Sequence, residues 1–181
     1  MVSVGKKKMD ITEFGKIVLH SKPVSLNSNS LVEVKRSYDF LKIFSKGKLI
    51  YGINTGFGPM AQYRIDDADL RQLQYNLVRS HSSGMGKVMT PVQTRALMLA
   101  RLNTLLLGYS GIHPDTVKLL STLINNEAYP CIYTHGGVGA SGDLVQLAHL
   151  ALGLIGEGEF WFKGKITPAK NVFKALELAP M

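Results

Sequence analysis

Apolar residues recur at helical spacing in several segments of the chain, and glycine-rich stretches separate these segments. The clearest pattern runs through Leu31, Val34, Tyr38, Leu41 and Phe44. Spacings of three and four residues place such side chains on one face of a helix. Ser30 and Glu33 predict a capping box at its start and Gly47 a stop after its end, so we expect a helix over residues 30–45.

The same periodicity predicts further helices. One follows Asp66, Asp67 and Asp69, whose negative charge suits a helix N-terminus. Residues 90–107 are apolar on nearly every face, which predicts a helix buried on all sides. Others are expected to begin at Pro114 and near residue 144, and residues 160–166 suggest a small hairpin. Residues 52–59 are interrupted by glycine and proline and predict a loop.

Composition places the chain among ordinary globular domains. Of its 181 residues, 45% are hydrophobic and 19% charged, and the formal net charge is +8. We therefore expect one domain over residues 1–181. The only run of basic residues, Lys6, Lys7 and Lys8, predicts a solvated tail rather than a nucleic-acid arm. No stretch has the roughly 20 apolar residues that a membrane helix needs. We expect no membrane or nucleic-acid partner.

The cysteine content bears on the compartment and on metal binding. Cys131 is the single cysteine, so an internal disulfide framework is excluded and no paired thiolates are available for a metal. Polar residues interrupt the N-terminal segment, which argues against a signal peptide. We expect a reducing cytoplasmic location and no metal.

Glycines are concentrated most strongly between residues 136 and 142, where three chemistries compete. Gly137, Gly139 and Gly142 spell G-x-G-x-x-G ahead of a predicted helix, the pattern of a dinucleotide-binding loop. That fingerprint also needs an acidic residue after a second strand, about 20 residues further on. Here Glu157 and Glu159 precede the only candidate strand. The context for a nucleotide is therefore missing.

A serine hydrolase is the second alternative. His135-Gly136-Gly137 imitates an oxyanion-hole motif, with Ser141 as the nucleophile. The nucleophile elbow G-x-S-x-G fails at its last position, where Asp143 stands. A loop that only turns the chain is a further, purely structural alternative.

Condensation of the backbone with itself is the third chemistry, and the residue types fit it position by position. The amide nitrogen of Gly142 can attack the carbonyl carbon of Ala140 to close a five-membered ring. Glycine leaves that nitrogen unhindered and lets the chain bend. Ser141 can lose its hydroxyl as water and leave a methylidene group. The product would be a 4-methylidene-imidazol-5-one (MIO), a carbon electrophile made from the chain.

The region around this tripeptide resembles a known family. Residues 136–144 (GGVGASGDL) and 156–159 (GEGE) are similar to the signature of the histidine and phenylalanine ammonia-lyases. Further stretches match in the family's order, so the resemblance covers the chain from about residue 31 onward: 51–58 (YGINTGFG), 76–81 (NLVRSH), 101–103 (RLN) and 108–111 (GYSG). The resemblance implies elimination of ammonia from an aromatic amino acid.

The family assigns roles to matching positions. Ala140, Ser141 and Gly142 would supply the MIO electrophile, with Gly139 in support. Asp143 would help cyclisation or orient the loop, and it is equally suited to cap the next helix.

The resemblance also implies a lid over the substrate. Tyr51 would act as the general base from a mobile loop. Gly56 and Gly58 would let that loop close over the substrate, which Gly58 would also contact.

Substrate choice rests on Ser80 and His81, which match the pair that reads the substrate side chain. A Ser-His pair favours L-histidine, giving trans-urocanate. Residues 60–64 and 81–84 also resemble bacterial tyrosine lyases, so L-tyrosine, giving p-coumarate, stays open, and phenylalanine is not distinguished.

The resemblance implies the N-terminal part of an ammonia-lyase fold of the fumarase/aspartase-like superfamily, mainly α with a small β component. Family members continue past the position of Met181 into a long helical bundle and form homotetramers. We expect the chain to be inactive alone. It would be either an inactive fragment or one half of a split lyase that a C-terminal chain completes.

Overall fold

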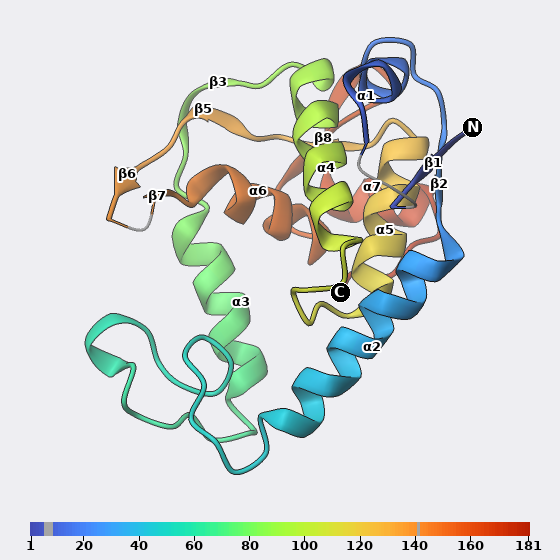
Figure 1. Cartoon of the computed structure of the whole chain (residues 1–181). Helices are drawn as coiled ribbons and strands as arrows, with labels where there is room; N and C mark the ends of the chain where they lie inside the picture. Colours follow the sequence, from blue (N-terminus) through green and yellow to red (C-terminus); the bar gives the residue numbers. More distant parts are fainter. Residues whose placement is uncertain (6–8, 141) are drawn as a thin grey trace.

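The computed structural model describes residues 1–5, 9–140 and 142–181. The predicted lysine tail, residues 6–8, and Ser141 lie outside the described residues. The described part is mainly α-helical (Figure 1). Its helices are α1 (Ile11–Val18), α2 (Ser28–Phe44), the 3-10 turn η1 (Gly58–Met60), α3 (Leu70–His81), α4 (Pro91–Leu105), α5 (Pro114–Asn125), α6 (Val145–Leu154) and α7 (Ala169–Ala175).

The strands are short and form small separate sheets. They are β1 (Val2–Val4), β2 (Val24–Leu26), β3 (Met85–Val88), β4 (Tyr129–Pro130), β5 (Tyr133–His135), β6 (Val138–Gly139), β7 (Gly142–Asp143), β8 (Glu159–Phe162) and β9 (Lys165–Pro168). β1 and β2 pair in parallel, whereas β3–β5, β6–β7 and β4–β8–β9 are antiparallel. Tertiary packing, not sheet formation, therefore determines the fold.

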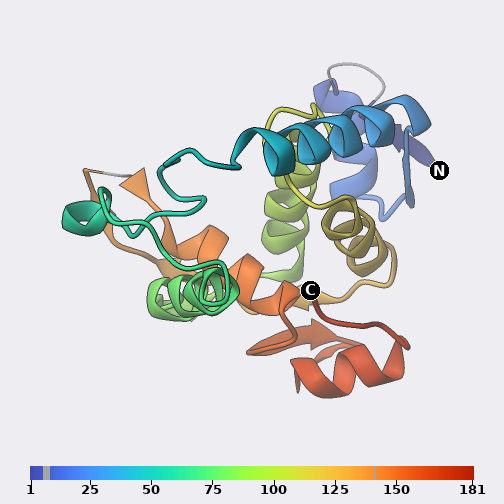
Figure 2. The same ribbon diagram turned by 90° about the horizontal axis from the view of Figure 1, so that it is seen from below.

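The hydrophobic core lies between α4 and α5, which pack side by side, with α1, α2 and the β4–β8–β9 sheet around them (Figures 1 and 2). Leu99 and Leu102 of α4 and Leu120 and Leu123 of α5 are fully buried. Burial of each such side chain contributes on the order of 2 kcal/mol. α3 and α6 pack against each other beside this core and carry the candidate site.

The predicted start of the long helix is wrong. α2 begins at Ser28, and the Asn27 side chain caps it by accepting the Ser30 backbone N–H at 3.2 Å. The Ser30 hydroxyl instead donates to the Gly5 carbonyl at 2.5 Å, and Glu33 pairs with Arg36. Asn and Ser are both good N-caps, so the sequence pattern fitted either position.

The helix predicted over residues 90–107 is present as α4, but its burial on all sides is wrong. A stripe through Met98, Leu99 and Leu102 is buried, while Val92 is 47% exposed and Ala100 is also exposed. Thr90 and Gln93 form the capping box at its start. The face of α4 that carries Val92 and Ala100 is therefore exposed in the described part of the chain.

The remaining predicted elements are confirmed. Helices α3, α5 and α6 form where periodicity placed them, and the β8–β9 hairpin turns at Lys163 and Gly164, which both have positive φ. Residues 45–69 form a loop that contains η1 and an isolated antiparallel bridge between Thr55 and Arg64. Within the described ranges, none of the helices is long and apolar enough to cross a membrane.

Candidate active site

The glycine-rich stretch folds as a two-stranded antiparallel pair. Gly139 lies opposite Gly142, and Val138 lies opposite Asp143. Gly142 has φ +84°, a left-handed conformation that is strained for any residue with a Cβ. Val138 is 86% exposed, and the pair projects from the body of the molecule (Figure 1). The chain thus reverses direction between Gly139, which precedes the tripeptide, and Gly142, its last residue.

Asp143 connects this glycine loop to α6. Its Oδ1 accepts the backbone N–H of Val145, the first residue of the helix, at 3.3 Å. A Cβ at Gly136 would collide with the Asp143 carboxylate, so glycine there leaves room for the side chain. The expectation that Asp143 is the N-cap of this helix is wrong, because Leu144 holds that position and Asp143 precedes it. Its carboxylate still accepts one N–H of the first turn, and a role in cyclisation stays a prediction.

Ser80 and His81 lie in the last turn of α3. The Ser80 hydroxyl donates to the Leu77 carbonyl at 3.0 Å and lies 3.1 Å from His81 Nδ1. His81 Nδ1 is also 3.0 Å from the Leu77 carbonyl oxygen. Because a carbonyl can only accept, this contact places the ring proton on Nδ1. In the neutral ring, Nε2 is then free to accept a hydrogen bond.

Two cavities meet at His81. The first, which we call the glycine-loop cavity, has a volume of about 390 Å³. Its walls are Ser80, His81, Ser83, Gly137, Gly139, Ala140, Gly142, Leu144 and Val145. The glycine loop and the end of α3 therefore face one common space.

The second, which we call the lid cavity, has a volume of about 560 Å³. Its walls are Tyr51, Phe57, Gly58, Leu77, Val78, His81, Leu144 and Ala148. His81 and Leu144 line both cavities, so the two spaces adjoin at these residues. Among the described candidate residues, Gly56 and Asp143 line neither cavity.

Tyr51 lies on the loop between α2 and α3. Its ring is 63% exposed and meets the Phe57 ring edge to face, with centroids 5.8 Å apart. Buried Asn54 holds this loop: its Oδ1 accepts the Ile50 N–H at 2.8 Å, and its Nδ2 donates to the Lys48 carbonyl at 2.7 Å. Neither Asn54 nor these two hydrogen bonds were predicted from the sequence, although Asn54 lies in the same motif as Tyr51.

The loop glycines differ in their role. Gly58 has φ +56° and begins η1, where a Cβ would meet open space. A Cβ at Gly56 would lie 2.6 Å from Met60 Cβ and 2.9 Å from the Met60 carbonyl oxygen. Gly56 therefore allows a close approach of the loop to itself.

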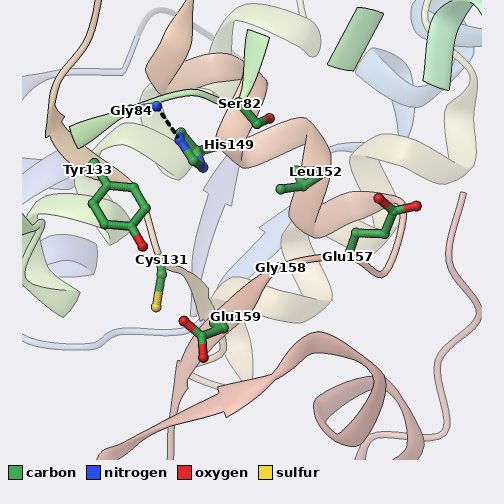
Figure 3. A pocket seen from close by; sticks show the side chains of 9 residues that line it. All are labelled: Ser82, Gly84, Cys131, Tyr133, His149, Leu152, Glu157, Gly158 and Glu159. Carbon is green, nitrogen blue, oxygen red and sulfur yellow. Dashed lines mark hydrogen bonds between the residues drawn. The ribbon is translucent and has the colours of Figure 1, made fainter. Parts of the chain in front are cut away.

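A third cavity, of about 310 Å³, lies behind the end of α3 (Figure 3). We call it the polar cavity. Its walls are Ser82, Gly84, Cys131, Tyr133, His149, Leu152, Glu157, Gly158 and Glu159. The Gly84 N–H donates to Nε2 of His149 at 3.1 Å, and His149 is only 7% exposed.

Burial and ion pairing shift the ionisation of groups around the polar cavity. Burial lowers the pKa of His149 and raises the pKa of Cys131 to about 11. Arg79 of α3 donates to both carboxylate oxygens of Glu157, and this hydrogen bonding lowers the pKa of Glu157. His149 is thus held as a neutral ring at neutral pH. Among the described residues, no group of three His, Cys, Asp or Glu side chains could hold a metal ion.

Comparison with known proteins decides the family. A family model described as aromatic amino acid lyase matches residues 9–181. The chain belongs to the aromatic amino acid lyase family. A histidine ammonia-lyase from Aliivibrio fischeri is 39% identical over 96% of this chain, and one from Stigmatella aurantiaca is 41% identical over 96%. The chain spans about a third of the length of these relatives, 34% of each.

Solved structures of aromatic amino acid lyases and related aminomutases share the fold. Tyrosine aminomutase from Streptomyces globisporus aligns with a TM-score of 0.90 at 31% identity, over 99% of this chain and 34% of that chain. Histidine ammonia-lyase from Trypanosoma cruzi aligns with a TM-score of 0.88 at 30% identity, over 99% and 34%. The expected fold class, the N-terminal part of the ammonia-lyase fold, is confirmed.

Proposed function

We propose that this chain provides the prosthetic-group loop, the lid and the side-chain-reading residues of an ammonia-lyase acting on an aromatic amino acid, with L-histidine as substrate and trans-urocanate as product. One observation carries the proposal. The glycine loop and the pair Ser80 and His81 line the same cavity of about 390 Å³. That volume lies in the range of small-molecule sites.

The residues present fit an MIO group formed from Ala140, Ser141 and Gly142. Gly142 has the positive φ that a sharp backbone bend requires, and a Cβ at Gly139 or Gly142 would meet no other atom within 4 Å. The Gly142 nitrogen would bond to the Ala140 carbonyl carbon with loss of one water, and Ser141 would lose a second. The ring supplies an electrophile that makes the substrate's ammonia a better leaving group.

His81 and Ser80 would read the substrate side chain. With the proton on Nδ1, His81 presents Nε2 as an acceptor for an imidazole N–H or a phenol O–H. Ser80, whose proton goes to Leu77, presents its oxygen as a second acceptor. A phenyl ring offers neither acceptor a donor, and a site built on hydrogen bonds discriminates strongly against such an analogue. This argument favours histidine or tyrosine over phenylalanine.

Tyr51 would take the substrate's β-proton as general base. Its ring lines the lid cavity, which adjoins the glycine-loop cavity at His81 and Leu144. Gly58 lines the same cavity, and Gly56 permits the tight path of the loop. Closure of the lid over both cavities would bring the phenol to the substrate and exclude water.

Tyrosine is the second candidate substrate. Tyrosine aminomutase from Streptomyces globisporus is 31% identical, whereas the histidine ammonia-lyase of Stigmatella aurantiaca is 41% identical. The higher identity and the Ser80–His81 pair together favour histidine. Neither the sequence identity nor the Ser80–His81 pair favours phenylalanine as the substrate.

The assembly is part of the proposal. We expect residues 1–181 to form a single domain that acts with the remaining length of a family member, in a homotetramer or with a complementing C-terminal chain, in the cytoplasm. An inactive fragment, in which the tripeptide stays uncyclised, is the competing possibility. These alternatives differ in whether the chain can complete an active site.

A complementation assay tests the proposal. The purified chain is mixed with the separately expressed C-terminal two thirds of the Aliivibrio fischeri relative, of which this chain matches 34%. Absorbance follows the formation of urocanate, p-coumarate and cinnamate from histidine, tyrosine and phenylalanine. We expect urocanate with the native chain and none with Ser141→Ala, which has no hydroxyl to lose.

The relative's own N-terminal third is the positive control. If it restores turnover and the present chain does not, the inactive fragment is the correct description. Brisk p-coumarate formation without urocanate would replace histidine by tyrosine as the substrate.

A further inference from the structure

A hydrogen bond joins two segments on either side of the candidate site. The Gly84 backbone N–H donates to His149 Nε2 at 3.1 Å, although the residues are 65 positions apart in sequence (Figure 3). Gly84 follows the end of α3, which carries Ser80 and His81. His149 lies on α6, the helix that follows the glycine loop. The bond therefore connects the side-chain-reading residues to the helix beyond the tripeptide.

The contact is close on every side. A Cβ at Gly84 would lie 2.9 Å from His149 Nε2, 3.0 Å from Tyr133 Cβ and 3.0 Å from Val145 Cγ1. These distances are shorter than almost all real Cβ contacts, so the backbone of Gly84 rests directly on α6 and β5. His149 is 7% exposed and its ring contacts Tyr133, with centroids 5.2 Å apart. The two residues are therefore in direct contact, and both also border the polar cavity.

The bond lies at the rear wall of the glycine-loop cavity. Ser83 lines that cavity, while its neighbours Ser82 and Gly84 line the polar cavity behind it. On α6, Val145 lines the glycine-loop cavity and His149, four residues later, lines the polar cavity. The segment 82–84 and α6 thus form one wall between two cavities, and the Gly84–His149 bond holds its parts in register.

We propose that His149 is a positioning residue, which fixes the segment after Ser80 and His81 against the helix that follows Ala140 and Gly142. The functional part of this inference rests on the proposed function. His149 does not line the glycine-loop cavity and acts through Gly84. A displaced segment 82–84 would shift His81 relative to the tripeptide, and catalytic groups tolerate little misplacement.

The bond requires a neutral histidine ring. Nε2 accepts the Gly84 N–H, so the ring proton lies on Nδ1, and a second proton would have to displace Gly84. Burial lowers the pKa of His149, which favours this acceptor form.

The groups that face His149 from the walls of the polar cavity include no positively charged side chain among the described residues. From the other walls of the polar cavity come Tyr133 of β5, Cys131, Glu157 and Glu159. Arg79 of α3 is engaged by Glu157, and α5 contributes no residue to the described lining. Burial is the cause of the lowered pKa of His149.

Hydrogen exchange in the chain itself tests the inference without any need for turnover. Nuclear magnetic resonance measures the exchange rate of the Gly84 amide, the protonation state of His149, and the shifts of Ser83 and Val145 as pH falls. We expect a protected Gly84 amide at neutral pH. Its exchange, corrected for the intrinsic pH effect, should rise about five- to tenfold as His149 takes up a proton, the scale of one lost hydrogen bond.

Three variants separate positioning from simple packing. His149→Gln keeps an acceptor and should retain protection while losing its pH dependence. His149→Leu fills the space without an acceptor and should lose protection and shift Ser83 and Val145. His20→Gln, at an exposed position, is the control and should behave as the native chain.

The outcomes are decisive even if His149→Leu fails to fold, because the native titration and the Gln variant need no such substitution. An unprotected Gly84 amide, or protection independent of the His149 proton, overturns the inference.

In the complemented enzyme, His149→Leu should lower kcat while leaving the two-water mass loss intact, and His149→Gln should restore kcat. Unchanged kcat in the Leu variant overturns the positioning role. Absence of turnover with the native chain counts against the proposed function alone and leaves the exchange result standing.

Discussion

Gly139 and Gly142 lie directly opposite each other in the β6–β7 pair, so the residue before the Ala140–Gly142 tripeptide pairs with its last residue. Only Gly142 of the two has a positive φ, at +84°. The strain that a Cβ would introduce is thus confined to the residue whose nitrogen is proposed to attack. This asymmetry makes the two glycines a matched pair for substitution.

Gly142→Ala should destabilise the chain and prevent ring formation. A non-glycine residue in the left-handed region costs about 1 kcal/mol, and the methyl group hinders the attacking nitrogen. Gly139→Ala, with neither positive φ nor a neighbour within 4 Å, should change stability by less than about 0.5 kcal/mol. Thermal unfolding gives the stabilities and intact mass reports the ring. Equal destabilisation by the two substitutions would contradict the conformational argument.

Asp143 can be tested for two separable roles. Asp143→Asn keeps an oxygen that can accept the Val145 N–H, so stability should be nearly unchanged, while the proposed help in cyclisation is lost with the charge. Asp143→Ala removes the acceptor as well and should cost about 1 kcal/mol, the usual net value of one hydrogen bond. Denaturant unfolding and intact mass of both variants are compared. Full cyclisation in the Asn variant would leave Asp143 with only its hydrogen bond to Val145.

The pH dependence of stability should contain a contribution from His149. Burial lowers its pKa in the folded chain below the ordinary value of 6.5, so below that pH the unfolded chain binds more protons than the folded chain. The stabilising contribution is therefore complete above about pH 6.5 and is lost as the pH falls toward the folded pKa. The free energy of unfolding of the native chain and of His149→Gln is measured from pH 7.5 to about 5. The two pH profiles should have the same slope above about pH 6.5, and below it the native profile should fall more steeply as the pH falls. Parallel curves throughout would show that His149 titrates alike in both states.

Gly108, in one of the family-like stretches, should be intolerant of a side chain. A Cβ there would lie 2.9 Å from the Glu33 backbone carbonyl carbon, and φ is +75°. We expect Gly108→Ala to cost about 2–3 kcal/mol, because strain and overpacking add. Gly47→Ala is the control, with φ +69° and open space around it, and should cost only the strain of about 1 kcal/mol. Similar losses in the two variants would show that contact with α2 is unimportant.

The sequence predicted those parts of the fold that depend on local pattern. Helices α3, α5 and α6 have clear apolar stripes, and the β8–β9 hairpin has a turn that glycine permits. The pairing of β6 with β7 could not be predicted, since two-residue strands rich in glycine carry no strand signal. The capping error at Ser30 arose because Asn27 is an equally good N-cap three residues earlier.

Contacts between segments that are distant in sequence are the part of the candidate site that could not be predicted from the sequence. Ser80, His81 and the glycine loop were identified from motifs, and the structure places them around one cavity. No spacing rule links Gly84 with His149. The same holds for Arg95, which is buried within α4 and pairs with Glu127 at 2.8 Å. Such pairs depend on how helices pack, which the periodicity of a single segment does not encode.

Ring formation from Ala140, Ser141 and Gly142 is tested by the mass of the peptide that contains residues 136–144, released by proteolysis from the native chain assembled with its complementing part and compared with Ser141→Ala. We expect the native peptide to be lighter than its sequence by two water molecules and the Ala variant to lack this loss. An unmodified native peptide from an assembly that releases ammonia from its amino acid would rule out the proposed ring.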